Sequence, residues 1–326
     1  MAPPKVGVIV PMYNSAGTID ATLRSVCAQS YETLDIVVVD DGGTDGSARI
    51  VADWTARDPR VRLVRKPNGG VAAARNFGAA ATDAPYLAFV DSDDLWAPDK
   101  IASQMALVAN EPDIPALVYC WYIHIDGDGR AFRALPHEAL EGRVLHDLYR
   151  ANFVGNGSSM LMPREIFDHV GGFDAGLRAG NAQGCEDLLF LLLAAEAYPF
   201  RVVPRYLVGY RVTQENMSSD TLQMLRSFDL VRARFEDKDS SSHAAWEEHR
   251  FGMIGWLAMR NLAAKRVGAS MRLMRLLFAA DPMRTLRMAP QLLTTFVRAV
   301  PPRWVKNTAR RLRPGLARPL YEDAKW

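Results

Sequence analysis

Three acidic residues lie within four positions at Asp91-Ser92-Asp93-Asp94, directly after the apolar run Tyr86 to Val90. Carboxylates packed this closely repel one another, so the cluster is costly unless a cation lies beside it. Mg²⁺ and Mn²⁺ bind such hard oxygens, commonly one or two carboxylates together with substrate phosphates. The alternative is a polar turn in which Asp or Ser caps the next helix. The cluster therefore favours a divalent metal site.

A second acidic loop, Asp40-Asp41-Gly42-Gly43, follows the apolar run Ile36 to Val39. A carboxylate in such a loop can accept a hydrogen bond from a nucleotide base or a ribose, and glycines let the backbone approach a ligand closely. The alternative is that Asp45 or Ser47 only caps the next helix. We expect that alternative to hold for Asp45 and Ser47, but not for Asp40 and Asp41.

Two further charged groups lie at the starts of helical patterns. Gly69-Gly70 precedes a helix in which Arg75 lies one turn from the start, where a cation can reach a phosphate or a base edge. The sequence fits neither the Walker loop nor the dinucleotide fingerprint. Glu186 and Asp187 precede the apolar helix 188–197. A carboxylate there is either a cap favoured by the helix dipole or a general base, and its position alone does not decide between them.

The elements that must position these groups alternate between strand and helix patterns. Strands are expected at 6–10, 36–39, 61–64 and 86–90, and helices at 15–30, 47–55 and 71–80. This alternation predicts an α/β fold, a Rossmann-like and mostly parallel sheet flanked by helices. Because ligands bind at the carboxyl ends of parallel strands, three polar clusters should converge on one crevice. They are Tyr13-Asn14, Asp40-Asp41 and Asp91 to Asp94.

Six motifs occur in the order seen in family 2 glycosyltransferases of the GT-A fold, which this chain resembles from about residue 5 to 219. They are Pro11-Met12-Tyr13-Asn14, Val39-Asp40-Asp41-Gly42, Gly70 to Asn76, Asp91 to Asp94, Gly171-Gly172-Phe173-Asp174 and Glu186-Asp187. The resemblance implies a catalytic domain over 1–220, with a nucleotide-sugar-binding half at 1–95 and an acceptor-binding half at 96–220. It also implies inverting transfer. The Gln-x-x-Arg-Trp motif of processive members is missing, so addition of a single sugar is expected.

The resemblance also implies a role for each matched residue. Pro11, Tyr13 and Asn14 would line the nucleotide base, Asp40 and Asp41 would lie near base and ribose, and Arg75 would contact the nucleotide. Asp91, Ser92 and Asp93 would hold the diphosphate and Mn²⁺ or Mg²⁺, with Asp93 the more direct metal ligand, Asp91 the second and Asp94 left open. Asp187 would be the catalytic base, with Glu186 as second choice. Arg211 and the segment 216–218 would form a later loop over the diphosphate.

Two rival functions share part of this pattern. A sugar-phosphate nucleotidyltransferase would need a glycine-rich LxGGxGTR-like loop after the first strand, where this chain has Pro11-Met12-Tyr13-Asn14. A non-catalytic nucleotide-sugar-binding scaffold would not need the full set of carboxylates. We therefore expect a metal-dependent hexosyltransferase-type enzyme that uses a nucleotide-sugar donor, with a UDP-sugar favoured.

Composition and targeting signals set the expected compartment. The chain has 326 residues, 49% hydrophobic and 23% charged, which is ordinary for a soluble globular protein. Its three cysteines form no CxxC pair, which argues against a zinc site or a disulfide framework and suits a reducing compartment. No signal peptide and no apolar window long enough to span a bilayer is apparent. A cytoplasmic location is expected.

The last part of the chain is strongly basic. From residue 250 to 326 there are 16 Lys or Arg and 3 Asp or Glu, interleaved with apolar side chains in a helical region expected at 221–326. Such helices often lie on anionic membranes, so a peripheral position at the inner face of the cell membrane is expected. The alternative is a helical face packed on the catalytic domain or in a homo-oligomer. No nucleic-acid-binding module is recognised. A membrane position would suit a saccharide or lipid-linked acceptor, as in bacterial polysaccharide or glycolipid assembly.

Overall fold

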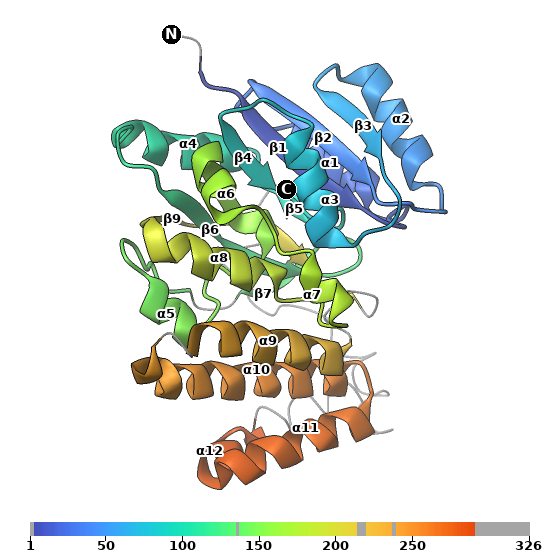
Figure 1. The fold of residues 1–326 in the computed structure, drawn as a ribbon. Coiled ribbons are helices and arrows are strands. Elements are labelled where there is room, and N and C mark those ends of the chain that lie inside the picture. Colours follow the sequence, from blue (N-terminus) through green and yellow to red (C-terminus); the bar gives the residue numbers. More distant parts are fainter. Residues whose placement is uncertain (1–2, 135–136, 214–219, 237–238, 291–326) are drawn as a thin grey trace, which may run out of the picture.

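The first half of the sheet consists of four parallel strands in the order β3-β2-β1-β4. The computed structural model describes residues 3–134, 137–213, 220–236 and 239–290. The strands are β1 (Val6–Met12), β2 (Leu34–Asp40), β3 (Val61–Arg65) and β4 (Tyr86–Phe89). The helices that connect them are α1 (Ile19–Cys27), α2 (Ser47–Arg57) and α3 (Val71–Ala80), and Figure 1 shows this unit at the top of the molecule.

Burial and register in these strands explain where the polar clusters lie. All seven residues of β1 are buried, which fits a short β-branched run in the middle of a sheet covered on both faces. Met12 at the end of β1 lies in register with Asp40 at the end of β2, and β4 runs parallel to both strands. The polar segments that follow β1, β2 and β4 therefore emerge at one edge of the sheet.

The second half of the sheet is mixed. It continues from β4 through β8, β6 and β9 to β5, and β7 pairs with β6. The strands are β5 (Leu95–Trp96), β6 (Leu117–Ile125), β7 (Ala131–Ala134), β8 (Met160–Pro163) and β9 (Phe200–Arg211). The helices are α4 (Lys100–Asn110), α5 (Leu145–Arg150), α6 (Arg164–Val170), α7 (Gly176–Ala179) and α8 (Glu186–Ala197), with a 3₁₀ turn η1 (Gly157–Ser159). The predicted α/β fold is thus confirmed.

The sequence pattern predicts two late strands, at 200–203 and 208–212, whereas the structure has one. A single strand, β9, covers the whole range 200–211 and runs parallel to β6. The register shifts between Cys120 and Tyr122 of β6, so Pro204 and Arg205 of β9 are passed over. A proline, which cannot donate to the ladder, is tolerated at such an irregularity. The strand therefore continues past Pro204, and Arg211 is its last residue rather than part of a loop.

Helices follow the sheet, as predicted for the region after residue 220. They are α9 (Thr221–Glu236), η3 (Ser240–Ser242), α10 (His243–Ala263), α11 (Val267–Ala280) and α12 (Pro282–Arg287), and Figure 1 shows α9 and α10 below α5 and α8, with α11 and α12 farther out. Buried Phe228 and Trp246 join the same apolar core as residues of α8. A separate unit from residue 221 stays a prediction, and residues 291–326 lie outside the described ranges.

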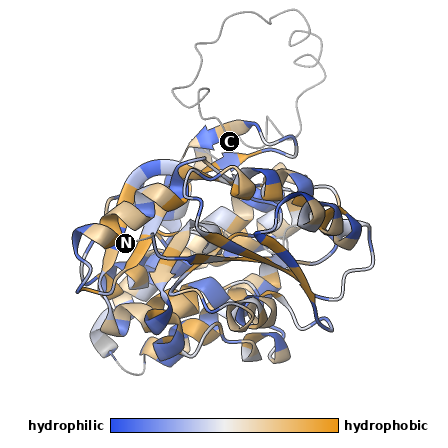
Figure 2. Ribbon diagram, turned by 90° about the horizontal axis from the view of Figure 1, so that it is seen from above, coloured by the Kyte–Doolittle hydropathy of each residue, from blue (hydrophilic) through white to orange (hydrophobic). Residues whose placement is uncertain are grey.

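Hydropathy follows this layering. Figure 2 shows apolar colour along the strands, whereas the helices carry both apolar and polar residues. This pattern is typical of strands covered on both faces and of amphipathic helices that cover them. Among the described helices, none is both long enough and apolar enough to span a bilayer.

Candidate active site

The acidic cluster after β4 divides into one buried carboxylate and two partly exposed ones. Asp94 is fully buried, and its Oδ2 accepts a hydrogen bond from Ser158 Oγ at 2.6 Å while its Oδ1 accepts from the Arg211 backbone N–H at 2.9 Å. Ser158 Oγ also accepts from the Asp91 N–H at 3.0 Å. Burial raises the pKa of Asp94 well above its usual value. Asp94 therefore anchors the cluster to η1 and β9, and Asp91 and Asp93 lie nearer the surface.

The donor set at Asp91 and Asp93 fits a divalent cation. Burial, followed by the nearby Asp91 carboxylate, raises the pKa of Asp93 to about 6. A carboxylate whose ionisation is disfavoured by burial and by a neighbouring carboxylate is one that a hard cation beside it would stabilise. Within the described ranges no three side chains of the His, Cys, Asp and Glu types form a metal cluster. Two carboxylates plus substrate phosphates are the usual set for Mg²⁺ and Mn²⁺, so the pair fits a metal that arrives with a donor.

Arg75 joins this cluster to the start of α8. Its side chain is 2% exposed, with Nη2 at 2.6 Å from Asp91 Oδ1 and Nη1 at 3.0 Å from Glu186 Oε1. The guanidinium also lies over the Phe173 ring, 5.0 Å from its centroid. The resemblance predicts that Arg75 contacts the nucleotide. The structure shows Arg75 as a bridge between two carboxylates that are 95 residues apart in the chain. A contact with nucleotide stays a prediction.

The two carboxylates at the start of α8 have different surroundings. Glu186 is buried and accepts hydrogen bonds from Arg75 and from the Gly184 N–H at 3.2 Å. Asp187 is half-buried, and its one hydrogen bond in the described part of the chain comes from the Leu188 N–H at 2.7 Å. Burial, and then the Glu186 carboxylate, raises the pKa of Asp187 to about 7. A carboxylate with that pKa can accept a proton near neutral pH, as a general base must.

In the loops after β1, β2 and β3, side-chain oxygens accept hydrogen bonds from backbone N–H groups. Asn14 has a positive φ of 49° and its Oδ1 accepts from the Thr44 N–H at 2.8 Å. Asp40 accepts from the Gly43 N–H at 2.9 Å. Asp41 accepts from the N–H groups of Gly69 at 2.9 Å and Gly70 at 2.8 Å, and so holds the loop that begins α3.

The remaining residues of the first motif and of the acidic cluster are also placed. Tyr13 is 53% exposed beside this edge, whereas Pro11 is buried within β1 opposite Val39. Ser92 Oγ lies 2.7 Å from Ser15 Oγ, which joins the loop after β1 to the acidic cluster. The three strand-end clusters therefore meet, as the sheet topology predicts.

Arg211 is buried behind the acidic cluster. Its Nε donates to the Asp93 carbonyl oxygen at 2.6 Å, and its Nη1 donates to the carbonyl oxygens of Asp126 at 2.8 Å and Gly127 at 2.6 Å. The end of β9 is thus hydrogen-bonded to two neighbouring turns, and Arg211 belongs to the strand. The prediction that Arg211 lies in a loop is wrong for this reason. The segment 216–218, expected to close over a diphosphate, lies outside the described residues.

Sequence reasoning did not single out three residues that hold this site together. Ser15 and Ser158 join loops that are 77 and 64 residues from their partners Ser92 and Asp94. Lys66 donates to Asp41 and directly follows β3. Its position at a strand end was a usable signal, because polar residues at the carboxyl ends of parallel strands share one edge. No local pattern marks the two serines.

Comparison with known proteins identifies the family. Residues 7–171, half of the chain, match the model of Glycosyl transferase family 2. The chain belongs to glycosyl transferase family 2. It is 25% identical over 244 residues to an uncharacterized glycosyltransferase of Rickettsia typhi, covering 72% of each chain. It is 24% identical over 231 residues to one of Haemophilus influenzae, covering 71% of this chain and 76% of the relative.

Solved structures show the same fold at low sequence identity. S. aureus TarS 1-349 matches with a TM-score of 0.58 and 16% identity, over 94% of this chain and 91% of that one. The match with a longer TarS structure covers 91% of the present chain and 53% of the TarS chain. The mannosyltransferase PcManGT from Pyrobaculum calidifontis, in complex with GDP-Man and Mn²⁺, matches with a TM-score of 0.57 and 21% identity, over 92% of this chain and 88% of that one. These neighbours establish the GT-A fold.

Proposed function

We propose that this glycosyltransferase moves a single sugar, with inversion, from a nucleotide-sugar donor to an acceptor hydroxyl. The observation that carries the proposal is the state of Asp187, a half-buried carboxylate with a pKa raised to about 7 beside the Arg75 bridge. Of the two carboxylates at the start of α8, Glu186 is paired with Arg75, so Asp187 is the one left to accept a proton. A base on one side of the anomeric carbon suits direct displacement, which inverts configuration.

The chain's own groups divide the work. Asp187 takes the proton from the acceptor hydroxyl as that oxygen attacks the anomeric carbon, and nucleoside diphosphate leaves. Asp91 and Asp93 would hold Mn²⁺ or Mg²⁺, which when bound neutralises charge on the leaving diphosphate. Asp41 and Asn14 keep the loops of the nucleotide side in place through the N–H groups of Gly69, Gly70 and Thr44. Ser158 and Arg211 fix the acidic cluster from behind.

The donor proposed is a UDP-sugar. Structures of TarS with UDP and with UDP-GlcNAc have this fold, and so has PcManGT with GDP-Man. We therefore include donors with both bases in the test, together with a dTDP-sugar as a third. Purified protein is incubated with UDP-, GDP- and dTDP-sugars, Mn²⁺ and saccharide acceptors, and released nucleoside diphosphate is measured. Nucleoside diphosphate that wild type releases from one donor, and that Asp187→Asn does not release, supports the proposal. Release of pyrophosphate from a nucleoside triphosphate and a sugar 1-phosphate, supplied in a separate reaction, would instead indicate nucleotidyl transfer.

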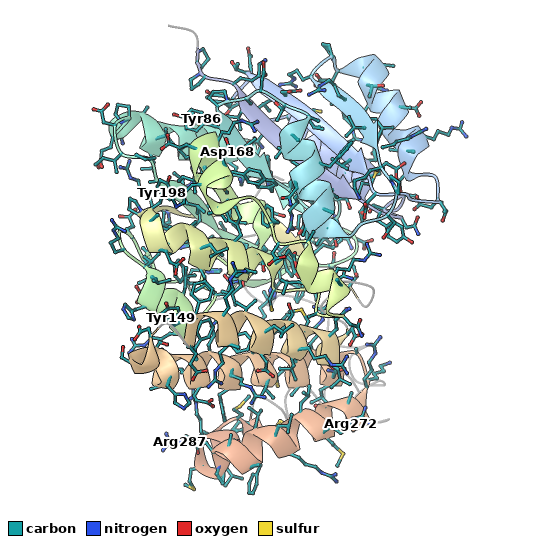
Figure 3. All side chains as sticks on the ribbon, in the orientation of Figure 1. Tyr86, Tyr149, Asp168, Tyr198, Arg272 and Arg287 are labelled. Carbon is teal, nitrogen blue, oxygen red and sulfur yellow. The ribbon has the colours of Figure 1, made fainter. Side chains whose placement is uncertain are left out.

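The proposed location is the cytoplasmic face of the membrane, in bacterial polysaccharide or glycolipid assembly. Exposed basic and apolar side chains share α11 and α12, and Figure 3 labels Arg272 and Arg287 on these helices. Phe278 is 50% exposed and Met283 is 65% exposed. Basic residues near an anionic bilayer contribute roughly 1 kcal/mol each. The double variant Arg272→Glu, Arg275→Glu should bind phosphatidylglycerol liposomes at least about tenfold more weakly at low salt. Wild-type protein that ignores these liposomes would refute the membrane location.

A further inference from the structure

The first residue of α4, Lys100, is a fully buried lysine. Lysine is almost never buried completely unless an acidic group pairs with it. In the described part of the chain Lys100 forms no ion pair, and its ammonium instead donates to Gln104 Oε1 at 2.8 Å and lies over the Trp96 ring, 4.0 Å from the centroid. Burying an ammonium without a carboxylate is costly, so these two neighbours indicate what Lys100 does.

Lys100 sets the orientation of the Gln104 amide. Burial lowers the pKa of Lys100 to about 8, so at neutral pH the amine is mostly protonated and can only donate hydrogen bonds. The amide of Gln104 must therefore turn its oxygen toward Lys100. Its Nε2 then points to the other side, where it donates to the carbonyl oxygens of Ser159 at 2.9 Å and Val118 at 3.0 Å.

The same ammonium holds the indole of Trp96. A cation over the face of an indole ring is attracted by its π-electrons, and the attraction is stronger where water is excluded. Trp96 is fully buried, and its Nε1 donates to the carbonyl oxygen of Ser158 at 3.0 Å. Lys100 thus fixes two side chains, Trp96 and Gln104, which donate to the carbonyl oxygens of two consecutive residues, Ser158 and Ser159.

These two carbonyl groups belong to the last residues of the turn η1. The last carbonyl groups of a helical turn have no partner within the turn, so donors from elsewhere help to decide how it lies. The Ser158 hydroxyl of this turn accepts from the Asp91 N–H at 3.0 Å and donates to Asp94 Oδ2 at 2.6 Å. A displacement of η1 would therefore move this hydroxyl relative to both acidic residues.

We propose that Lys100 is a positioning residue of the donor site that acts through Gln104 and Trp96. These two side chains hold η1, and η1 in turn holds Ser158 against the acidic cluster. The inference rests on the proposed function, because the carboxylates concerned are those that would hold the metal and the diphosphate. Removing a group that orients metal ligands typically weakens metal binding by about 10- to 100-fold.

The test measures, by calorimetry on the full chain, the affinity for a nucleoside diphosphate with and without Mn²⁺. The probes are UDP, GDP and dTDP, and the one that wild type binds most tightly is used for the variants. Lys100→Met keeps a side chain of similar length but removes the donor. We expect the affinity in Mn²⁺ to fall about tenfold, while the affinity without Mn²⁺ stays within about twofold of wild type.

Combined variants test whether Lys100 acts through its two neighbours. Gln104→Met removes the hydrogen bond to Ser159, and Trp96→Phe removes the one to Ser158 while keeping an aromatic ring. Each should also weaken binding in Mn²⁺. Adding Lys100→Met to the pair should weaken it by less than about twofold more, because both links to η1 are already lost. A further tenfold loss would show that Lys100 acts by another route and would overturn the inference.

Controls separate positioning from stability. Trp54→Phe removes an indole hydrogen bond of equal length, from Nε1 to Asp20 Oδ1 at 3.0 Å, and should leave both affinities unchanged. A variant that loses stability in urea yet keeps its affinity in Mn²⁺ would show that Lys100 only supports the core, and would overturn the inference. Trp96→Phe, the smallest change, decides the question if Lys100→Met does not fold.

The same measurements distinguish this inference from the proposed function. Wild-type protein whose nucleotide affinity is equal with and without Mn²⁺ would overturn the proposed metal role, and the positioning role of Lys100 with it. Affinity that depends on Mn²⁺ in wild type, and equally in Lys100→Met and Trp96→Phe, would overturn the positioning role alone.

Discussion

Replacing Arg75 by Met should destabilise the protein strongly and in a way that depends on pH. The guanidinium is 2% exposed and pairs with Asp91 at 2.6 Å and Glu186 at 3.0 Å, so Met would fill similar space but leave two carboxylates without their cation. Removing one partner of a buried ion pair costs about 3–5 kcal/mol. We expect the free energy of unfolding to fall by about that amount at pH 7.5.

The sign of the pH dependence follows from the same contacts. Without Arg75 the carboxylates of Asp91 and Glu186 have no cation beside them in the folded protein, so the destabilisation is present when both are ionised. A neutral carboxyl group needs no cation, so the loss of stability should be smaller in acid. Urea denaturation at pH 7.5 and pH 5 measures the difference.

A matched control and an intermediate variant sharpen the measurement. Arg24→Met removes the exposed i,i+4 pair with Asp20, which should cost at most about 1 kcal/mol at either pH. Arg75→Lys keeps the charge but not the fork that contacts two carboxylates, so it should fall between wild type and Arg75→Met. A loss below about 1 kcal/mol in Arg75→Met, or one independent of pH, would refute the bridge as the feature that holds the site together.

Three further outcomes follow from the site. The rate of sugar transfer should rise with pH through about 7, because Asp187 must lose its proton to act as a base. The variant Asp187→Asn should lower turnover about 10²- to 10⁴-fold while donor binding persists. A flat pH–rate profile in wild type would count against this role of Asp187. Asp93→Ala should abolish the part of nucleotide affinity that depends on Mn²⁺, measured by calorimetry with and without the metal, and equal affinities under the two conditions would argue against a metal at this carboxylate. The variant Asp41→Ala leaves the N–H groups of Gly69 and Gly70 without their acceptor. The free energy of unfolding, measured with heat or urea, should fall by about 1–3 kcal/mol, and nucleotide binding should weaken. Unchanged stability would show that the loop does not depend on Asp41.

The sequence predicted the sheet and the meeting point of its polar clusters well. β-branched runs alternating with helical spacing imply parallel strands, and parallel strands bring their carboxyl ends to one edge. That reasoning places Asn14, Asp41 and Asp93 around one edge of the sheet, where the structure has them. It depends only on local periodicity and on a topological rule, which is why it succeeded.

The predictions that differed concern contacts between distant segments. Arg75 and Glu186 are 111 residues apart, and no spacing rule shows that they pair. The continuous β9 depends on irregular pairing with β6, which lets Pro204 lie inside a strand. Tertiary packing decides each of these features, and the local sequence does not encode it.

The most direct test of the central claim is the configuration of the transferred sugar. With the donor that the panel selects, an α-linked UDP-sugar in the proposed case, the product can be followed by proton NMR of the anomeric position. A single β-linked sugar, formed by wild type and absent with Asp187→Asn, is the result expected if Asp187 deprotonates the acceptor during direct displacement. An α-linked product, or an Asp187→Asn variant that turns over at nearly the wild-type rate, would contradict the mechanism.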